Sequence, residues 1–114
     1  RFAPSSDADS AATGTADGQG TPLVSRLAPP SPNPAMDRVT IRFDVAARAP
    51  VRVAAFDIQG RLIRSMVDEE LLPGRYEKLW DGRNERGQAV ATGAYLVHFR
   101  TTGVAQTRKM LFLR

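Results

Sequence analysis

Short segments in which apolar and polar residues alternate recur along most of the chain, separated by turn residues. The clearest example is VTIRFDV, residues 39–45, where four apolar residues alternate with polar ones. A period of two is the pattern of a strand with one buried face. About seven such segments follow one another at intervals of roughly 9 to 14 residues, which predicts an all-β sandwich of antiparallel strands. The expected strands cover residues 22–29, 39–45, 51–58, 61–67, 75–80, 95–101 and 107–114.

Turn residues separate these segments. The prolines within 29–34 exclude a helix or a central strand there, because proline lacks the N–H that either structure needs. Gly60 is expected to close a turn over 57–61, since glycine takes positive φ without steric cost. Residues 68–74, DEELLPG, are expected to form another turn, and DEELL is too short to matter as a helix. The strand at 51–58 has apolar residues on both faces, so we expect it to be central and covered on both sides.

The first residues differ in composition from the rest. Residues 1–21 are mostly Ala, Ser, Thr, Asp and Gly, with Phe2 as the single large apolar residue of the first 20. Such a segment cannot bury enough apolar surface to offset the entropy of ordering it, so we expect a flexible, disordered linker. Residues 22–114 are expected to form one domain. The chain does not begin with Met, and we expect it to be a fragment or a processed product.

Composition excludes several functional classes. The chain has no Cys, which excludes a disulfide framework, a thiolate zinc site and a cysteine nucleophile. The net charge of +4 comes largely from arginines at alternate strand positions rather than in a run, a pattern that argues against nucleic-acid binding. No apolar run approaches the length of roughly 20 residues that a membrane helix needs, so we expect no membrane insertion.

The stretch LWDGRNERGQAVATGAY, residues 79–95, has two interpretations. Asp81, Asn84 and Glu85 could supply oxygens to a metal, but their spacing does not fit a calcium loop. We therefore interpret the stretch as consecutive tight turns. Trp80, at the end of an alternating strand, is expected in the core rather than as a ligand platform. Tyr95 either hydrogen-bonds back to the backbone, as in a tyrosine corner, or makes a simple cross-strand contact.

No set of residues suggests catalysis or a cofactor. His98, the only histidine, has no neighbouring nucleophile motif and is expected on a strand face. Asp57 and the acids of 68–70 could be read as paired carboxylates, but we place them in turns or at strand ends. Gly-rich phosphate loops are missing from the sequence. We predict a protein that is not an enzyme and needs no cofactor or metal.

Taken in order, three segments resemble a known family. They are residues 30–45, 51–100 and 107–114. Together they resemble the immunoglobulin-like domain of the flagellar hook-capping protein FlgD and the related C-terminal sorting domains of the type IX (Por) secretion system. The W-D-G, the following polar turn and the G-x-Y are the most specific part. The terminal KMLFLR, residues 109–114, is similar to the end of the sorting domains.

The resemblance implies a fold and assigns residues to it. It implies an immunoglobulin-like β-sandwich of about seven strands without catalytic residues. Two departures, Ala35 after the second proline and Thr92 before Gly93, leave open whether the chain is a sorting signal or a generic FlgD-like module. The residues that match the sorting pattern are Gly93, Tyr95, Lys109, Met110 and Leu111, and those that match the shared scaffold are Asp57, Gly60, Trp80, Asp81, Gly82 and Gly87.

The resemblance also implies partners and a location. A sorting domain follows an upstream cargo domain on the same chain and is recognised by the outer-membrane secretion machinery. The protein is thus expected in the periplasm in transit and then at the cell surface or outside the cell. In many such proteins a sortase-like peptidase at the cell surface removes the domain. The alternative is a structural or assembly domain, as in the hook cap. We further expect the strand around residues 109–113 to lie at a sheet edge and to offer unpaired backbone groups to a partner.

Overall fold

The computed structural model describes residues 21–113, so the linker expected before residue 21 lies outside the described residues. All seven strands pair antiparallel with their neighbours in a sheet. Within 21–113 the chain contains no helix, and thus none that could cross a membrane. The strands are β1 (Arg26–Leu27), β2 (Val39–Val45), β3 (Ala49–Asp57), β4 (Leu62–Leu71), β5 (Gly74–Trp80), β6 (Gly93–Thr101) and β7 (Val104–Phe112).

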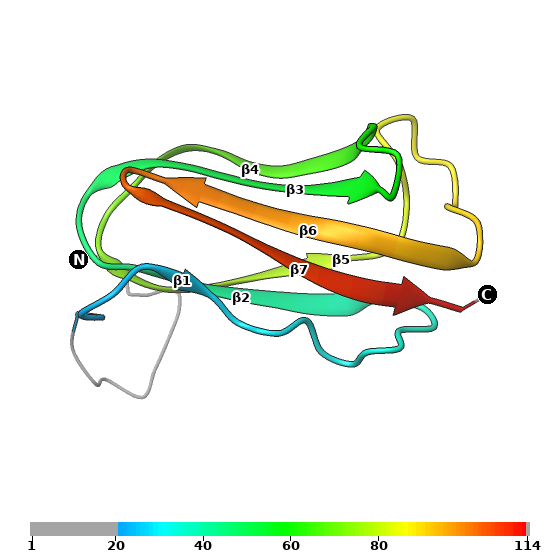
Figure 1. Ribbon diagram of the computed structural model, residues 1–114, viewed down its shortest axis with the longest axis horizontal. Coiled ribbons are helices and arrows are strands. Elements are labelled where there is room, and N and C mark those ends of the chain that lie inside the picture. Colours follow the sequence, from blue (N-terminus) through cyan, green and yellow to red (C-terminus); the bar gives the residue numbers. More distant parts are fainter. Residues whose placement is uncertain (1–20, 114) are drawn as a thin grey trace.

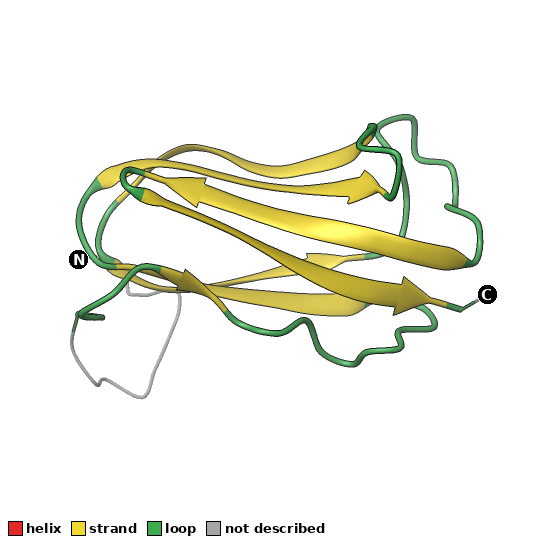
Figure 2. Cartoon of the chain, in the orientation of Figure 1, coloured by secondary structure: helices red, strands yellow, loops and turns green. Residues whose placement is uncertain are grey.

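The strands form two facing layers, which confirms the predicted immunoglobulin-like sandwich. One sheet has the order β1-β2-β5 and the other the order β4-β3-β6-β7. Figure 1 shows the two layers stacked, with β7 running diagonally across the front. Figure 2 shows that loops gather at the two ends of the sandwich. β7 is an edge strand, so one of its two edges pairs with β6 and the other is not paired with a strand of the same sheet.

Alternation along the strands produces the core between the sheets. In β2 every second residue is buried, from Val39 to Val45, as the period of two requires. Phe43 of β2 lies between the rings of Tyr76 and Phe99, with centroid distances of 5.4 and 5.5 Å. The contact with Phe99 joins the two sheets. The largest fully buried side chains include Leu27, Ile41, Phe43, Val51, Val53, Trp80, Val97, Phe99, Met110 and Phe112.

The prediction of a turn over residues 68–74 is wrong in its first half. Asp68, Glu69 and Glu70 belong to β4, where they pair with residues 50–52 of β3. Their side chains are exposed, so the strand carries charge without any cost of burial. The ladder of backbone hydrogen bonds with β3 outweighs the local resemblance of DEELLPG to a turn. The turn itself is confined to the residues between Leu71 and Gly74.

Other boundaries also differ from the expectation. β1 has two residues, because only Arg26 and Leu27 pair with β2, and Leu23 is 96% exposed. β7 begins at Val104, since the turn at Gly103 lets it pair with β6 from Thr101 onward. β3 is central, as expected. Its outer face is only half covered, with Ala54 buried and Phe56 partly exposed.

Candidate recognition surface on the last strand

Trp80 and Tyr95 close one end of the sandwich beneath the last strand. The Trp80 side chain is 2% exposed. Its ring meets Tyr95 and Phe112 edge-on, at centroid distances of 5.9 and 5.3 Å. The expected core position of Trp80 is confirmed, and through Phe112 the indole packs directly against β7. The ring is therefore part of the support of the last strand rather than a ligand platform.

The hydroxyl of Tyr95 decides between the two interpretations of that residue. It donates a hydrogen bond to the carbonyl oxygen of Ala91 at 2.6 Å. This bond back to the backbone four residues upstream is the geometry of a tyrosine corner. It holds the end of the 81–92 loop against the start of β6.

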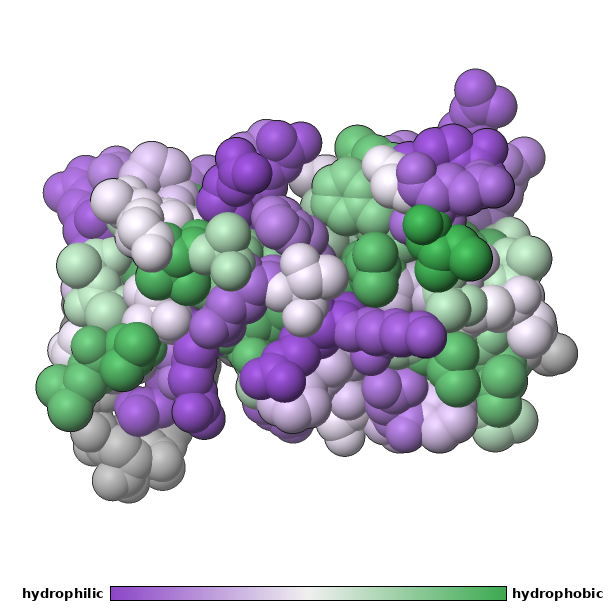
Figure 3. All heavy atoms as spheres, in the orientation of Figure 1, coloured by the Kyte–Doolittle hydropathy of each residue, from purple (hydrophilic) through white to green (hydrophobic). Residues whose placement is uncertain are grey.

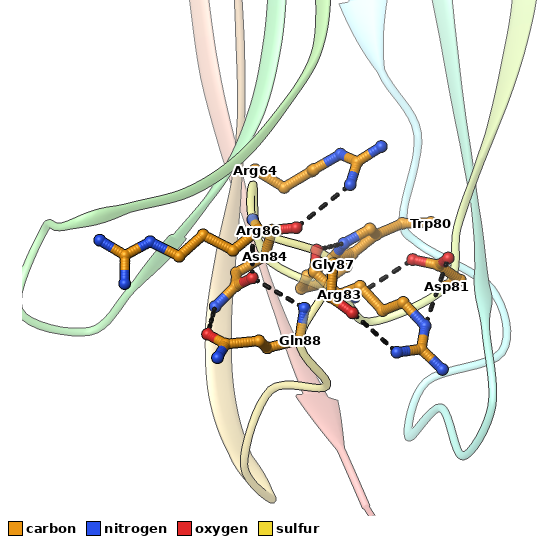
Figure 4. A network of polar contacts seen from close by, with 8 residues as sticks. All are labelled: Arg64, Trp80, Asp81, Arg83, Asn84, Arg86, Gly87 and Gln88. Carbon is orange, nitrogen blue, oxygen red and sulfur yellow. Dashed lines mark hydrogen bonds and ion pairs between the residues drawn. The ribbon is translucent and has the colours of Figure 1, made fainter.

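Within the 81–92 loop, the polar side chains bind backbone groups, as the turn interpretation predicts. Asp81 Oδ1 accepts a hydrogen bond from the Arg83 N–H at 3.1 Å. Asn84 Oδ1 accepts hydrogen bonds from the N–H groups of Arg86 and Gln88, at 2.9 and 3.0 Å. Figure 4 shows these contacts gathered around the loop, with the Trp80 indole N–H donating to the Arg83 carbonyl at 3.0 Å. The turns match the mechanism by which Asp and Asn stabilise loops.

Two glycines of this loop have positive φ angles. Gly82 has φ of 71° and Gly87 has φ of 79°, both in the left-handed region that other residues rarely adopt. No cluster of three or more acidic or histidine side chains suited to a metal ion occurs among residues 21–113. The loop therefore supports the fold through its turns.

Asp57 organises the second predicted turn. Its Oδ1 accepts hydrogen bonds from the N–H groups of Gln59 and Arg61, both at 2.9 Å. Its Oδ2 pairs with the Arg61 guanidinium at 2.7 Å. The backbone N–H of Arg61 is the main cause that holds the pKa of Asp57 below its ordinary value, and burial opposes the shift. Gly60, with φ of 86°, completes the turn as expected.

The five residues of the sorting pattern lie together on β6 and β7. The register places Tyr95 opposite Met110 and Gly93 opposite Phe112. They do not share a face, however. Tyr95 and Met110 point into the core and are 7% and 0% exposed. Lys109 and Leu111 alternate with them on the outer side, and Leu111 is 41% exposed.

Further apolar side chains are exposed near the end of β7. Leu113 is 42% exposed, and Met36 is 68% exposed. The two lie near each other, because Ala35 forms a parallel bridge with Phe112. Figure 3 shows hydrophobic residues at the end of the molecule where β7 ends. We call Lys109, Leu111 and Leu113 the β7 surface.

The edge of β7 is not open where the sequence suggested it. β7 does lie at the edge of its sheet. Over residues 109–113, however, the segment Asn33–Ala35 already binds its backbone. The N–H of Leu111 donates to Asn33 Oδ1 at 3.0 Å, and the N–H of Ala35 donates to the Leu111 carbonyl at 2.8 Å. The expectation of unpaired groups is wrong here.

Two further bonds complete this cover of the edge. The Asn33 side-chain amide donates to the Lys109 carbonyl at 3.2 Å. The N–H of Leu113 donates to the Ala35 carbonyl at 2.8 Å. A partner that adds a strand at this edge would first have to displace Asn33–Ala35. Side chains, by contrast, remain available on the β7 surface.

The first half of β7 is joined to β1 through side chains. Gln106 Oε1 accepts a hydrogen bond from the Leu27 N–H at 2.7 Å. Arg108 Nε donates to the Leu27 carbonyl at 3.1 Å. These contacts bridge the two sheets along one side of the sandwich, and they explain how a strand of two residues is held in place. Sequence reasoning missed this role, because the residues are about 80 positions apart.

His98 lies on the outer face of β6, as expected of a strand-face histidine. Its Nδ1 lies 3.0 Å from Thr107 Oγ1. The ring of Phe56 meets the imidazole edge-on at 6.2 Å. These two contacts hold the imidazole between β7 and β3 on the sheet surface.

Comparison with known proteins gives a family and a set of similar folds. The sequence profile of the FlgD Ig-like domain family matches residues 34–103. No curated protein sequence matches the chain. Among solved structures, the dimeric latent PorU from Porphyromonas gingivalis is similar with a TM-score of 0.63 and 21% identity. That match covers 88% of this chain and 10% of PorU.

Two further structures have the same fold. PorZ, an essential bacterial surface component of the type IX secretion system of P. gingivalis, matches with a TM-score of 0.55 and 24% identity. The match covers 79% of this chain and 11% of PorZ. FLGD from P. aeruginosa matches with a TM-score of 0.52 and 17% identity, covering 80% of this chain and 77% of that one. The chain thus spans about a tenth of PorU and of PorZ.

Proposed function

The chain belongs to the FlgD Ig-like domain family, and on that premise we propose that it is a non-catalytic, C-terminal sorting and surface-anchoring module of a larger exported bacterial protein. In this role it follows an upstream cargo domain and is recognised by outer-membrane secretion machinery of the type IX kind. A sortase-like peptidase would act on it at the cell surface. The protein would pass through the periplasm on the way.

The observation that carries the proposal is the arrangement of the last strand. The register with β6 fixes the side chains of β7 in two sets, with Met110 and Phe112 in the core and Lys109 and Leu111 outside. Outward side chains on a rigid strand can be read by a receptor without unfolding the domain. The exposed Leu111 and Leu113 beside Lys109 form an amphipathic surface suited to a protein contact.

The similar folds of PorU and PorZ add support. PorZ is described as an essential surface component of a type IX secretion system. The chain corresponds to only about a tenth of the length of each of these proteins, which suits a module within a longer chain. At these identities the likeness is one of fold, so the sorting role rests on the β7 surface and on the motif resemblance.

A fusion experiment tests the sorting role. Residues 21–114 are placed after a periplasmic reporter, in one host with a type IX secretion system and in one that lacks it. We expect the reporter at the cell surface only in the first host. Equal distribution of the reporter in both hosts would contradict the proposal. The reporter without the domain controls for leakage.

The likeness to FLGD from P. aeruginosa favours a second function. The match extends over 77% of that chain, so the domain could serve instead as a structural or assembly module. In that case the fusion would stay in the periplasm of both hosts. The purified chain would then associate with other copies or with a structural partner through its sheets.

A further inference from the structure

The outer face of the four-stranded sheet carries an open groove beside the β7 surface, because Leu96 in the groove is the cross-strand partner of Lys109. Its volume is about 410 Å3. The floor is apolar, formed by buried Ala54 and by the partly exposed Phe56 and Leu96. The side chains of Arg52 and Arg100 line the same groove. We call it the Arg52–Arg100 groove.

The two arginines are an unfavourable pair in the free domain. Arg52 of β3 and Arg100 of β6 are direct cross-strand partners, and both side chains are exposed. Like charges placed directly opposite each other on neighbouring strands destabilise a sheet. An anion bound between them would remove that repulsion.

Neither arginine of this pair forms an ion pair with an acid of residues 21–113, although Asp68 lines a neighbouring hollow together with both of them. Asp68 of β4 is the partner of Arg52 on its other side. The other sheet shows the usual arrangement. There Arg42 faces Glu77 directly across the strands, with an ion pair of 3.3 Å.

The apolar part of the groove lies at a fixed spacing from the arginines. Phe56 and Leu96 are themselves cross-strand partners, four residues along from the arginine pair. At the rise of a strand, four residues correspond to about 13 Å. Between them, His98 is held by Thr107 at 3.0 Å and by its edge contact with Phe56. The groove thus presents cations at one end and apolar surface at the other.

We propose that the Arg52–Arg100 groove binds an extended acidic segment of a partner protein. A carboxylate of that segment lies on the arginine pair, and an apolar side chain about four residues away packs on Phe56 and Leu96. The planar guanidinium matches a carboxylate with two parallel hydrogen bonds. This binding does not depend on the sorting role.

An NMR titration of the full chain tests the proposal with a defined probe. The probe is the peptide Glu-Glu-Ser-Thr-Ser-Leu-Leu, and the matched control peptide carries Lys in place of both Glu residues. We expect the acidic peptide to shift the amide signals of residues 52–56 and 96–100, with affinity that falls as salt is added. The Lys peptide should leave these signals unchanged.

Matched variants show whether the arginine pair is responsible. The double variant Arg52→Gln with Arg100→Gln should bind the acidic peptide at least about tenfold more weakly, since it loses two charge-assisted contacts. The control is Arg38→Gln with Arg86→Gln, which removes the same charge from exposed positions outside the groove. It should bind like the unmodified chain. Circular dichroism checks that both variants keep the sheet.

Several results would overturn the proposal. These are shifts with the Lys peptide as large as with the acidic one, shifts confined to other residues, or equal weakening in both double variants. Absence of any shift at millimolar peptide would do the same. Tighter binding to phosphatidylglycerol vesicles than to the peptide would assign the groove to a membrane instead. Self-association that Arg52→Gln with Arg100→Gln abolishes would assign it to a second copy of the chain.

Discussion

Asn33 binds the backbone of the last strand at Leu111, 78 residues away in the sequence, through a hydrogen bond of 3.0 Å to its Oδ1. The amide group of the same side chain donates to the Lys109 carbonyl. One side chain therefore satisfies two backbone groups at the edge of the sheet. Ala35 continues the cover through its own N–H and carbonyl.

Replacing Asn33 with Ala should loosen the end of β7. The substitution removes two exposed hydrogen bonds, at a cost of about 1 kcal/mol in the free energy of unfolding. Amide hydrogen exchange at Leu111 should become faster, because its N–H loses its partner. Asp37→Ala, at a nearby exposed position, is the control and should change neither quantity. Unchanged exchange at Leu111 would mean that the contact does not protect the edge.

Tyr95 and Tyr76 allow a matched test of the tyrosine corner. Each hydroxyl donates to a carbonyl four residues upstream at 2.6 Å. Tyr95 is the more buried of the two. Tyr95→Phe should lower the free energy of unfolding by about 1 to 1.5 kcal/mol, and Tyr76→Phe by about 0.5 kcal/mol. Urea denaturation followed by Trp80 fluorescence measures both, and the reverse order would contradict the assignment.

Two glycines should differ in how much stability the domain loses when each is replaced with Ala. Gly87→Ala should cost about 1 to 2 kcal/mol of stability, because φ is 79° there and an L-residue is strained in that region. Gly93→Ala should be nearly neutral, since a Cβ there would meet no heavy atom within 4 Å. Thermal unfolding compares the two. If Gly93→Ala destabilises as much as Gly87→Ala, the backbone at Gly93 is more constrained than the structure indicates.

Asp57 should make the domain sensitive to acid. Its pKa is lower in the folded state than its ordinary value of 3.8, so the unfolded state binds its proton first as the pH falls. The free energy of unfolding therefore decreases on acidification and is constant above the ordinary pKa. Asp57→Asn keeps an oxygen acceptor for the turn but cannot titrate. Its urea unfolding should depend less on pH between roughly pH 2 and pH 5.

Asp44 provides a contrast of opposite sign. Burial raises its pKa in the folded state, with Arg75 and Arg26 opposing the shift. The folded state then holds the proton longer as the pH rises, so ionisation of Asp44 reduces stability above its ordinary pKa. Asp44→Asn should remove that loss. Urea unfolding as a function of pH compares Asp44→Asn with Asp57→Asn. If both variants change the pH dependence of the free energy of unfolding in the same direction, one of the two pKa shifts has the wrong sign.

Much of the fold follows from local pattern, because a strand with one buried face encodes its own period. Residues 39–45 are an example, and so is the Asp57 turn, whose hydrogen bonds span four residues at most. The acids at 68–70 show the limit. Their sequence resembles a turn, while pairing with β3 places them in a strand.

The candidate surface was only partly predictable, because local pattern does not encode contacts between distant residues. The motif resemblance identified Lys109, Met110 and Leu111, and strand alternation implies that they cannot all face outward. The cover of the edge by Asn33 and Ala35 depends on contacts between the two ends of the domain. No local pattern encodes such contacts, and they exist only once the sandwich has formed.

The central claim is that the outward side chains of β7 are what the secretion machinery recognises. Deleting the strand would not test it, because Met110 and Phe112 belong to the core and their loss would unfold the domain. The variant Lys109→Glu with Leu111→Glu changes only exposed positions. Arg86→Glu, in the exposed loop, is the control.

The most direct measurement is the fraction of a fused reporter that reaches the cell surface in a host with a type IX secretion system. We predict that Lys109→Glu with Leu111→Glu lowers this fraction to the level seen in a host without the system, while Arg86→Glu leaves it unchanged. Surface delivery by the folded double variant at the unmodified level would contradict the claim.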